Sequence, residues 1–308
     1  MEASIALKKV GKLSGEKTVL ADLTFGIEKG SLTAIIGAND AGKSTLMNVM
    51  SGIEIPNYGA VYIDGLDLTK RRAEIRKEIG FIPMEVDLEL GMTLEENIYF
   101  VASLYSLDNS TIQNRLQYFS EKLNIEENLQ DYPGNVSTGI QKKAMLLRVL
   151  VLDSSVIFFD EPTAFMDPES ARQTWAILKD LQPEKTIVYT SQNLKEVEQN
   201  HDRILVLDAG KIVLDGHLDK LLESTVEYHQ FQMELENMTD ELYEQIEKIP
   251  TVVTPKKHGN VILFYGRSKS VFFQVLEKID LQLVKDLEIK KLGLDDLLDS
   301  QLIRKGLD

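Results

Sequence analysis

The residues best suited to chemistry in this sequence form one run, GANDAGKST, at Gly37–Thr45. Its spacing is G-x-x-x-x-G-K-[ST], in which the backbone N–H groups of a loop and the positive end of the next helix surround a phosphate. Lys43 would supply a charge to the β- and γ-phosphates, and the Ser44 hydroxyl would ligate Mg²⁺. The predicted nucleotide-binding residues are Gly37, Asn39, Asp40, Ala41, Gly42, Lys43, Ser44 and Thr45.

A second chemical element is the apolar run VIFFDEP at Val156–Pro162, which ends in two acids. A parallel strand that ends in this way places its acids at the carboxyl edge of the sheet, where open α/β folds bind ligands. Asp160 would hold the metal ion that Ser44 shares, and Glu161 would orient or deprotonate the attacking water. Acids also end ordinary strands, so the phosphate loop decides in favour of the functional interpretation.

The elements that must position these residues alternate between strands and helices. The phosphate loop follows a short apolar run, Leu32–Gly37, and precedes a helix that ends near Gly52. Residues from about 92 to 152 show helical spacing, a helix is expected around Glu169–Leu181, and a hairpin is expected at Ile204–Gly216. Strands separated by helices predict an α/β fold with a parallel sheet and crossover connections.

The composition changes near residue 221, and a second, smaller α+β domain is predicted beyond it. We place the boundary between residues 1–225 and 226–308. The expected elements of the second domain are strands at Val226–Leu235, Thr251–Thr254, Asn260–Gly266 and Leu283–Leu292, with helices at Thr239–Ile249 and Ser270–Ile279. This succession, β-α-β-β-α-β, is the ferredoxin-like order.

The motifs and their order resemble the ATP-binding cassette (ABC) ATPases, the nucleotide-binding subunits of ABC transporters. The family's LSGGQ signature corresponds to VSTGI at Val136–Ile140, which retains Ser137 and Gly139, and its DEPT-SGLD run corresponds to Asp160–Asp167. The resemblance covers about residues 5–221 and implies a P-loop NTPase with a helical insert at about 86–152. It also implies MgATP as cofactor, a dimer-contact role for Asp167, an integral membrane permease and a second ATPase subunit. The tail, with LGLDDLL at Leu292–Leu298, is similar to the C-terminal extension of drug- and sodium-exporter subunits.

Five features of the nucleotide site depart from the family pattern. They lie at Ser14, Asp40, Met84, the signature residues Thr138 and Ile140, and Gln192. Ser14 stands where the family stacks an aromatic ring on adenine, and Asp40 adds negative charge beside the phosphates. Met84 replaces a Gln and cannot coordinate a metal ion, although its neighbour Glu85 carries a carboxylate. Gln192 replaces the switch histidine; it can donate to a phosphate but cannot change its protonation near neutral pH.

Composition excludes several other classes of protein. The net charge of −15 disfavours direct binding to nucleic acid or to an anionic membrane surface, and the absence of cysteine excludes disulfide frameworks and cysteine catalysis. The longest apolar runs are shorter than a membrane span, and the N-terminus lacks the features of a signal peptide. We therefore expect a cytoplasmic protein that reaches the inner face of the cell membrane only through its permease.

Two functions remain open after these observations. The chain is either an energy-coupling ATPase or a nucleotide-gated interaction subunit that hydrolyses ATP poorly in its own site. Because the Gln and His equivalents are missing, we expect the chain to be the degenerate half of a heterodimer rather than an active homodimer. In that heterodimer Glu161 and Gln192 are the candidate catalytic residues of the chain's own site.

Overall fold

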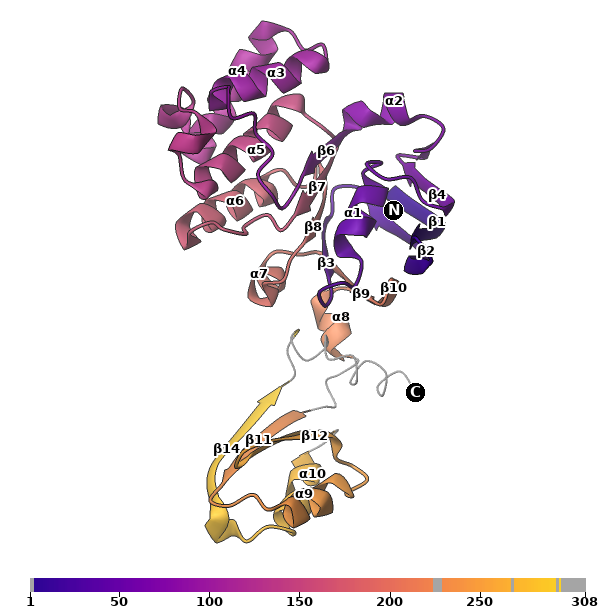
Figure 1. Cartoon of the computed structure of the whole chain (residues 1–308), viewed down its shortest axis with the longest axis vertical. Helices are drawn as coiled ribbons and strands as arrows, with labels where there is room; N and C mark the ends of the chain where they lie inside the picture. Colours follow the sequence, from indigo (N-terminus) through magenta and orange to yellow (C-terminus); the bar gives the residue numbers. More distant parts are fainter. Residues whose placement is uncertain (1–2, 224–228, 267–268, 292–293, 295–308) are drawn as a thin grey trace. The chain divides into compact units, whose positions relative to one another are not determined.

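The computed structural model describes residues 3–223, 229–266, 269–291 and 294 of the 308-residue chain (Figure 1). The chain divides into two compact units, Met1–Asp215 and Gly216–Asp308. The division falls earlier than the expected boundary at residue 225, and it assigns α8 (Leu218–Glu223) to the second unit.

The first unit is built on a six-stranded sheet with the order β10-β9-β3-β8-β7-β6. Its strands are β3 (Leu32–Ile36), β6 (Ile79–Ile82), β7 (Val156–Asp160), β8 (Thr186–Thr190), β9 (Arg203–Asp208) and β10 (Lys211–Gly216). The pairs from β9 to β6 are parallel, and every residue of β3, β7 and β8 is buried. Continuous apolar runs are typical of parallel strands that are covered on both faces. The predicted α/β fold is therefore confirmed.

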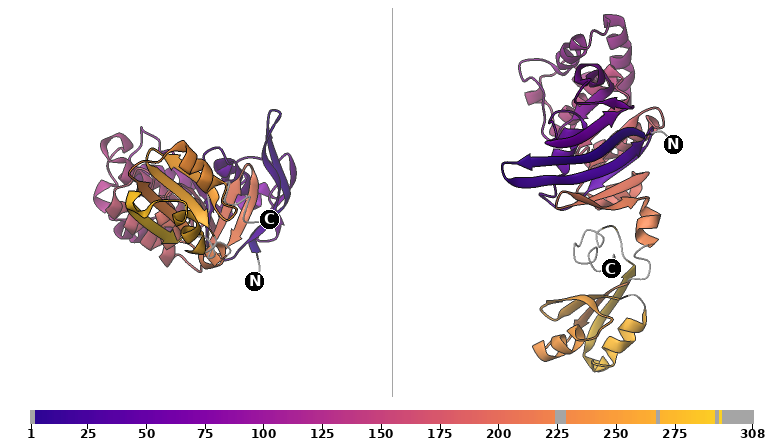
Figure 2. Two further views of the ribbon diagram at one scale, coloured as in Figure 1. Left: turned by 90° about the horizontal axis from the view of Figure 1, so that it is seen from below. Right: turned by 90° about the vertical axis from the view of Figure 1, so that its right-hand side faces the viewer.

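A second, antiparallel sheet of the first unit has the order β2-β1-β4-β5. It consists of β1 (Ala3–Ser14), β2 (Lys17–Glu28), β4 (Tyr58–Ile63) and β5 (Leu66–Asp67), and the right panel of Figure 2 shows the long β1–β2 hairpin in indigo. Helix α1 (Lys43–Met50) shares one buried apolar cluster with both sheets, through Leu46 and Met47 among others. The helix that carries the phosphate loop is thus fixed between two layers.

Helices fill the stretch between β6 and β7, as the periodicity predicted. These helices are α3 (Leu94–Leu104), α4 (Asn109–Leu123) and α5 (Thr138–Leu152). The short α2 (Arg72–Ile75) precedes β6, and α6 (Pro168–Asp180) and α7 (Leu194–Gln199) follow β7. Thr93 starts α3 with a reciprocal capping box to Glu96, and Asp108 starts α4 by accepting from the Thr111 amide. Such caps satisfy N–H groups that a helix start leaves free.

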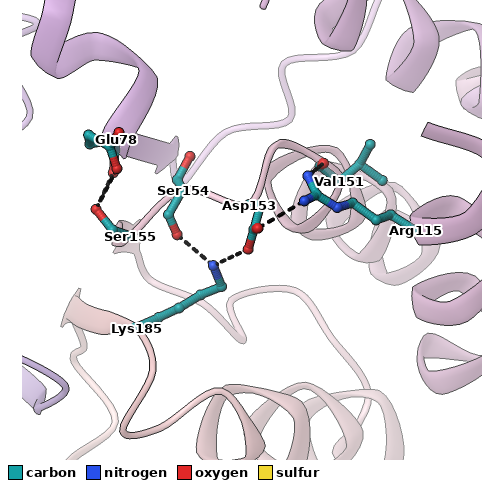
Figure 3. A network of polar contacts seen from close by, with 7 residues as sticks. All are labelled: Glu78, Arg115, Val151, Asp153, Ser154, Ser155 and Lys185. Atoms are coloured by element: carbon teal, nitrogen blue, oxygen red, sulfur yellow. Dashed lines mark hydrogen bonds and ion pairs between the residues drawn. The ribbon is translucent and has the colours of Figure 1, made fainter. Parts of the chain in front are cut away.

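A polar network ties the helical region to the amino ends of the central strands (Figure 3). The Lys185 ammonium lies 2.6 Å from the Asp153 carboxylate, which also accepts from Arg115 of α4 at 2.9 Å. Beside it, the Ser155 hydroxyl donates to the Glu78 carboxylate at 3.0 Å. Because Asp153 ends α5 and Lys185 precedes β8, this network joins α4 and α5 to the sheet at the edge opposite the phosphate loop.

The second unit contains one four-stranded antiparallel sheet with the order β12-β13-β11-β14. Its elements are β11 (His229–Leu235), α9 (Asp240–Glu247), β12 (Val253–His258), β13 (Val261–Gly266), α10 (Lys269–Leu276) and β14 (Val284–Lys291). Their succession is β-α-β-β-α-β, which is the ferredoxin-like arrangement. Positions 226–228 of the first predicted strand, and the LGLDDLL run apart from Leu294, lie outside the described residues.

Candidate nucleotide-binding site

The phosphate loop connects β3 to α1, and its two glycines are required, one by close packing and the other by its backbone conformation. A Cβ at Gly37 would lie 2.2 Å from the Leu207 carbonyl oxygen, so no larger residue fits without a shift of backbone. Gly42 has φ +103, a conformation that residues with side chains rarely adopt. Asp40 occupies the left-handed region at φ +64, where the family has glycine, and its side chain is exposed. The loop therefore keeps its expected shape while carrying an extra carboxylate.

Lys43 closes the loop from its own first helical turn. Its ammonium donates to the carbonyl oxygens of Gly37 at 2.9 Å and Ala38 at 3.0 Å. Burial lowers the pKa of Lys43, and the nearby carboxylates of Glu161 and Asp160 oppose that shift. The Lys43 ammonium is thus held inside the loop that the motif predicts to bind phosphates. Asp160 and Glu161 at the end of β7 lie close enough to affect its pKa.

The two acids at the end of β7 are organised by a residue that the sequence analysis did not single out, Thr190. Asp160 and Thr190 are paired across β7 and β8, and the Thr190 hydroxyl donates to the Asp160 carboxylate. The Thr190 hydroxyl oxygen also accepts from the backbone N–H of Glu161 at 3.0 Å. Glu161 itself has φ +53. Because this pairing depends on strand register, it was not readable from the local sequence.

The Glu161 carboxylate lies in a pocket of about 520 Å³ whose wall includes Met84 and Gln192. One carboxylate oxygen accepts from the backbone N–H of Gln192 at 3.2 Å, and the other, Oε1, is buried with no hydrogen-bond partner among the described residues. Burial raises the pKa of Glu161, and this suits a group that takes a proton from water. Glu85, the neighbour of Met84, is exposed and is not among the described residues that line this pocket.

The signature residues and Asp167 meet on the surface of the same unit. Ser137 is the N-cap of α5 and accepts from the Ile140 amide at 3.3 Å. Asp167 is the N-cap of α6 and accepts from the amides of Glu169 and Ser170, both at 3.0 Å. A Cβ at Gly139 would lie 3.9 Å from the Asp167 carboxylate, so the two loops are neighbours. Both polar residues have a local capping role, and Ser137 also remains exposed at a helix start.

Lys142 of α5 is a second residue that the sequence analysis missed. Its side chain is 0% exposed, and its ammonium donates to the backbone carbonyls of Pro83, at 3.0 Å, and of Met84. Burial lowers the pKa of Lys142 to about 8, while Asp160 and Glu161 partly oppose the shift. The helix of the signature loop is therefore bonded to the segment that carries Met84. A lysine after a signature motif gives no sequence signal of burial, because lysine is ordinarily exposed.

The residues present fit a nucleotide with its metal ion. The loop holds a buried cation and a glycine-lined backbone, Ser44 is exposed at the start of α1, and Asp160 stands at the carboxyl end of β7 in the sheet that also contains β3. Oε1 of Glu161 is a buried polar atom that finds no hydrogen-bond partner within the described part of the chain. Ser14 is exposed at the end of β1 and offers no ring. Fold and site together define a P-loop nucleotide-binding protein.

Comparison with known proteins identifies the family. The family model described as "ABC transporter" matches residues 20–164. The chain is 31% identical over 205 residues to the ABC transporter ATP-binding protein NatA of Bacillus subtilis (strain 168), covering 66% of this chain and 83% of that protein. It is 25% identical over 280 residues to the Nod factor export ATP-binding protein I of Cupriavidus metallidurans, covering 90% of each.

A solved dimeric ATP-binding cassette in a post-hydrolysis state, bound to ADP and Pi, matches 70% of this chain and 98% of its own, with 25% identity and a TM-score of 0.64. The chain therefore belongs to the ABC transporter family and is one of its ATP-binding proteins. Among the described residues, no helix has the length and apolarity needed to cross a membrane.

Proposed function

We propose that the chain is the ATP-binding subunit of an ABC transporter and that it couples ATP binding and hydrolysis to a separate membrane permease. The observation that carries this proposal is that Lys43, at the start of α1, lies close to Asp160 and Glu161 at the carboxyl end of β7. These three residues are among the parts needed to hold and hydrolyse a nucleotide. The chain itself would stay on the cytoplasmic side and reach the membrane through the permease. Its net charge of −15 gives it no general attraction to anionic lipid or to nucleic acid.

The roles of the residues follow from their places. The loop amides from Gly37 to Thr45 and the Lys43 ammonium would bind the phosphates, and Ser44 with Asp160 would hold Mg²⁺. The bound metal ion would neutralise charge on the phosphates. Glu161 would orient and deprotonate the attacking water, because burial has raised its affinity for a proton. Gln192 would donate a hydrogen bond where the family places histidine, and Asp167, Ser137 and Gly139 would face a second subunit.

We further propose that the chain is the degenerate half of a heterodimer. In the family each nucleotide lies between one subunit's phosphate loop and the other's signature loop. Met84 offers only a thioether, and its carbonyl is already bonded to Lys142, so the chain's own site lacks a polar side chain at that position. The competent site would combine the partner's phosphate loop with Ser137 and Gly139 of this chain. The alternatives are a nucleotide-gated regulatory or interaction subunit with little or no hydrolysis of its own and a homodimeric active ATPase.

Hydrolysis measured with and without a co-expressed partner tests the proposal. The chain alone should hydrolyse ATP slowly, and the pair should be active. In the pair, Ser137→Arg should reduce activity more than Glu161→Gln, because the signature loop serves the competent site. Strong hydrolysis by the isolated chain that Glu161→Gln abolishes would contradict the heterodimer and support a homodimer. Binding of ATP without hydrolysis by any pair would support the regulatory alternative.

A further inference from the structure

The second unit exposes one open sheet edge. Strand β14 pairs with β11 on one side, and no strand of the described chain pairs with its other side. Edges of this kind invite pairing with another chain, and natural proteins usually block them. The opposite edge of the same sheet is blocked in this way. Strand β12 carries Pro255, which has no N–H to donate, and its register shifts between Val253 and Lys256. Strand β14 has a regular ladder with β11 from Asp286 to Lys291 and contains no proline; the charges that it carries, Lys285, Lys290 and Lys291 among them, restrict which partner strand can pair with it.

The open edge also continues the apolar core of the unit. Leu287 and Ile289 are the cross-strand neighbours of Met233 and Phe231, both of which are fully buried beneath the helices. Cross-strand neighbours share a face, so the two β14 side chains extend the core to its margin. They remain 37% and 40% exposed. An added strand would cover both side chains.

Helix α10 adds a third exposed apolar residue on the same side. Phe272 stacks on Phe231 with ring centroids 5.8 Å apart, and Phe273 is 63% exposed beside it. Successive helical residues turn by about 100°, so Phe273 and Gln274 lie on opposite flanks of the buried stripe. Gln274 contacts Thr251, just after α9, at 2.7 Å. The flank that carries Phe273 therefore faces away from α9. In the sheet, β14 is likewise the edge strand opposite β12.

Two charged residues of β14, Glu288 and Lys290, are complementary to each other in one register of self-pairing. Glu288 and Lys290 lie on the other face of the sheet, where they form an ion pair at 3.1 Å. If a second copy pairs antiparallel about a two-fold axis through Ile289, Glu288 of each copy faces Lys290 of the other, and the two Ile289 side chains meet. An axis through Glu288 would oppose that carboxylate with itself, and an axis through Leu287 would oppose Asp286 with Glu288. Opposite charges stabilise directly facing positions and like charges destabilise them.

We propose that β14 joins two copies of this chain by antiparallel edge pairing centred on Ile289, which makes one continuous sheet from two second units. The contact is separate from the nucleotide sandwich of the first unit and needs no nucleotide. In a heterodimeric ATPase it would join two complexes, each through its single copy of this chain.

Cysteine scanning tests the register directly, because the natural chain contains no cysteine. Directly opposed residues have Cα atoms about 4.5–5.5 Å apart, within the range that a disulfide needs. Without nucleotide and under mild oxidation, Ile289→Cys should give an intermolecular disulfide. Asp286→Cys, on the same strand but far from the axis, is the matched control and should give little. Equal yields from both positions would overturn the proposal.

Sedimentation velocity on the full chain without nucleotide supplies the second test. The unmodified chain should dimerise, and Ile289→Asp should weaken the dimer at least about tenfold. Ile53→Asp, the same change at a half-exposed isoleucine of the first unit, should leave it unchanged. Glu288→Lys alone should weaken dimerisation, and adding Lys290→Glu should restore it. A monomeric full chain at about 100 µM, or dimerisation only after removal of the residues beyond Lys291, would show that the edge is not used in this way.

Discussion

The buried ammonium of Lys142 should make the stability of the first unit rise with pH. Its pKa is lowered from 10.5 to about 8 in the folded chain, because burial penalises the charged form more than Asp160 and Glu161 favour it. Between these two values the unfolded chain binds the proton more tightly than the folded chain. Folding stability therefore increases as the pH rises through this window.

The size of the effect follows from the two pKa values. The lowering of the pKa from 10.5 to about 8 means that the folded chain disfavours the charged ammonium by about 3 kcal/mol. Between pH 7 and pH 9.5 the free energy of unfolding should regain about 2 kcal/mol of this cost. Lys142→Met removes the titrating group and keeps a similar length. The free energy of unfolding of the unmodified chain should thus gain about 2 kcal/mol relative to Lys142→Met over this range, whatever the difference between them at pH 7.

Urea unfolding followed by tryptophan fluorescence measures this quantity for the first unit alone. The chain has one tryptophan, Trp175, and it is buried in α6. Lys70→Met changes a lysine whose side chain is 78% exposed and should reproduce the pH dependence of the unmodified chain. Parallel pH dependences of the unmodified chain and Lys142→Met would show that the ammonium is not desolvated and would refute the reasoning.

Three other outcomes are expected. Lys43→Ala should abolish or strongly weaken ATP binding in calorimetry, because the loop loses its one fixed cation; unchanged affinity would contradict the assignment. Asp40→Gly should tighten ATP binding about fivefold, because Asp40 is exposed and two like charges about 4 Å apart in a water-like dielectric repel by about 1 kcal/mol. An Asp40→Asn variant with the same gain would assign the effect to charge alone. Asp153→Ala should lower the free energy of unfolding by about 2 kcal/mol, because Lys185 and Arg115 lose their carboxylate partner; a loss below 0.5 kcal/mol would mean that the network in Figure 3 contributes little.

The sequence was sufficient for the phosphate loop and the parallel strands because both signals are local. Gly37 to Thr45 form a contiguous motif, and β3, β7 and β8 are short runs of buried residues bounded by loops. The helical stretch was likewise visible from its periodicity, although its three separate helices were not delimited. The C-terminal strands were also anticipated from alternation, within a few residues of their observed bounds.

What the sequence did not reveal depends on residues that are distant along the chain. Thr190 contacts Asp160 only because β8 pairs with β7 in one register, and Lys142 is buried only because α5 packs over the segment after β6. Neither residue type suggests this on its own, since threonine is common in strands and lysine at surfaces. Ser137 and Asp167 both cap helices, and the capping role of Asp167 was not predicted from the sequence. The proposed functions of these two residues must therefore be separated from their effect on helix starts.

The arrangement around Thr190 also fixes the direction of a chain of hydrogen bonds. A hydroxyl has one proton, and Thr190 gives it to Asp160 while its lone pair receives the Glu161 N–H. The chain of bonds thus runs one way, from the Glu161 backbone to the Asp160 oxygen, and it requires Asp160 to be an acceptor. The two bonds consequently fix the Glu161 backbone against the Asp160 side chain before any ligand arrives, and Thr190→Ser preserves both bonds whereas Thr190→Val removes them.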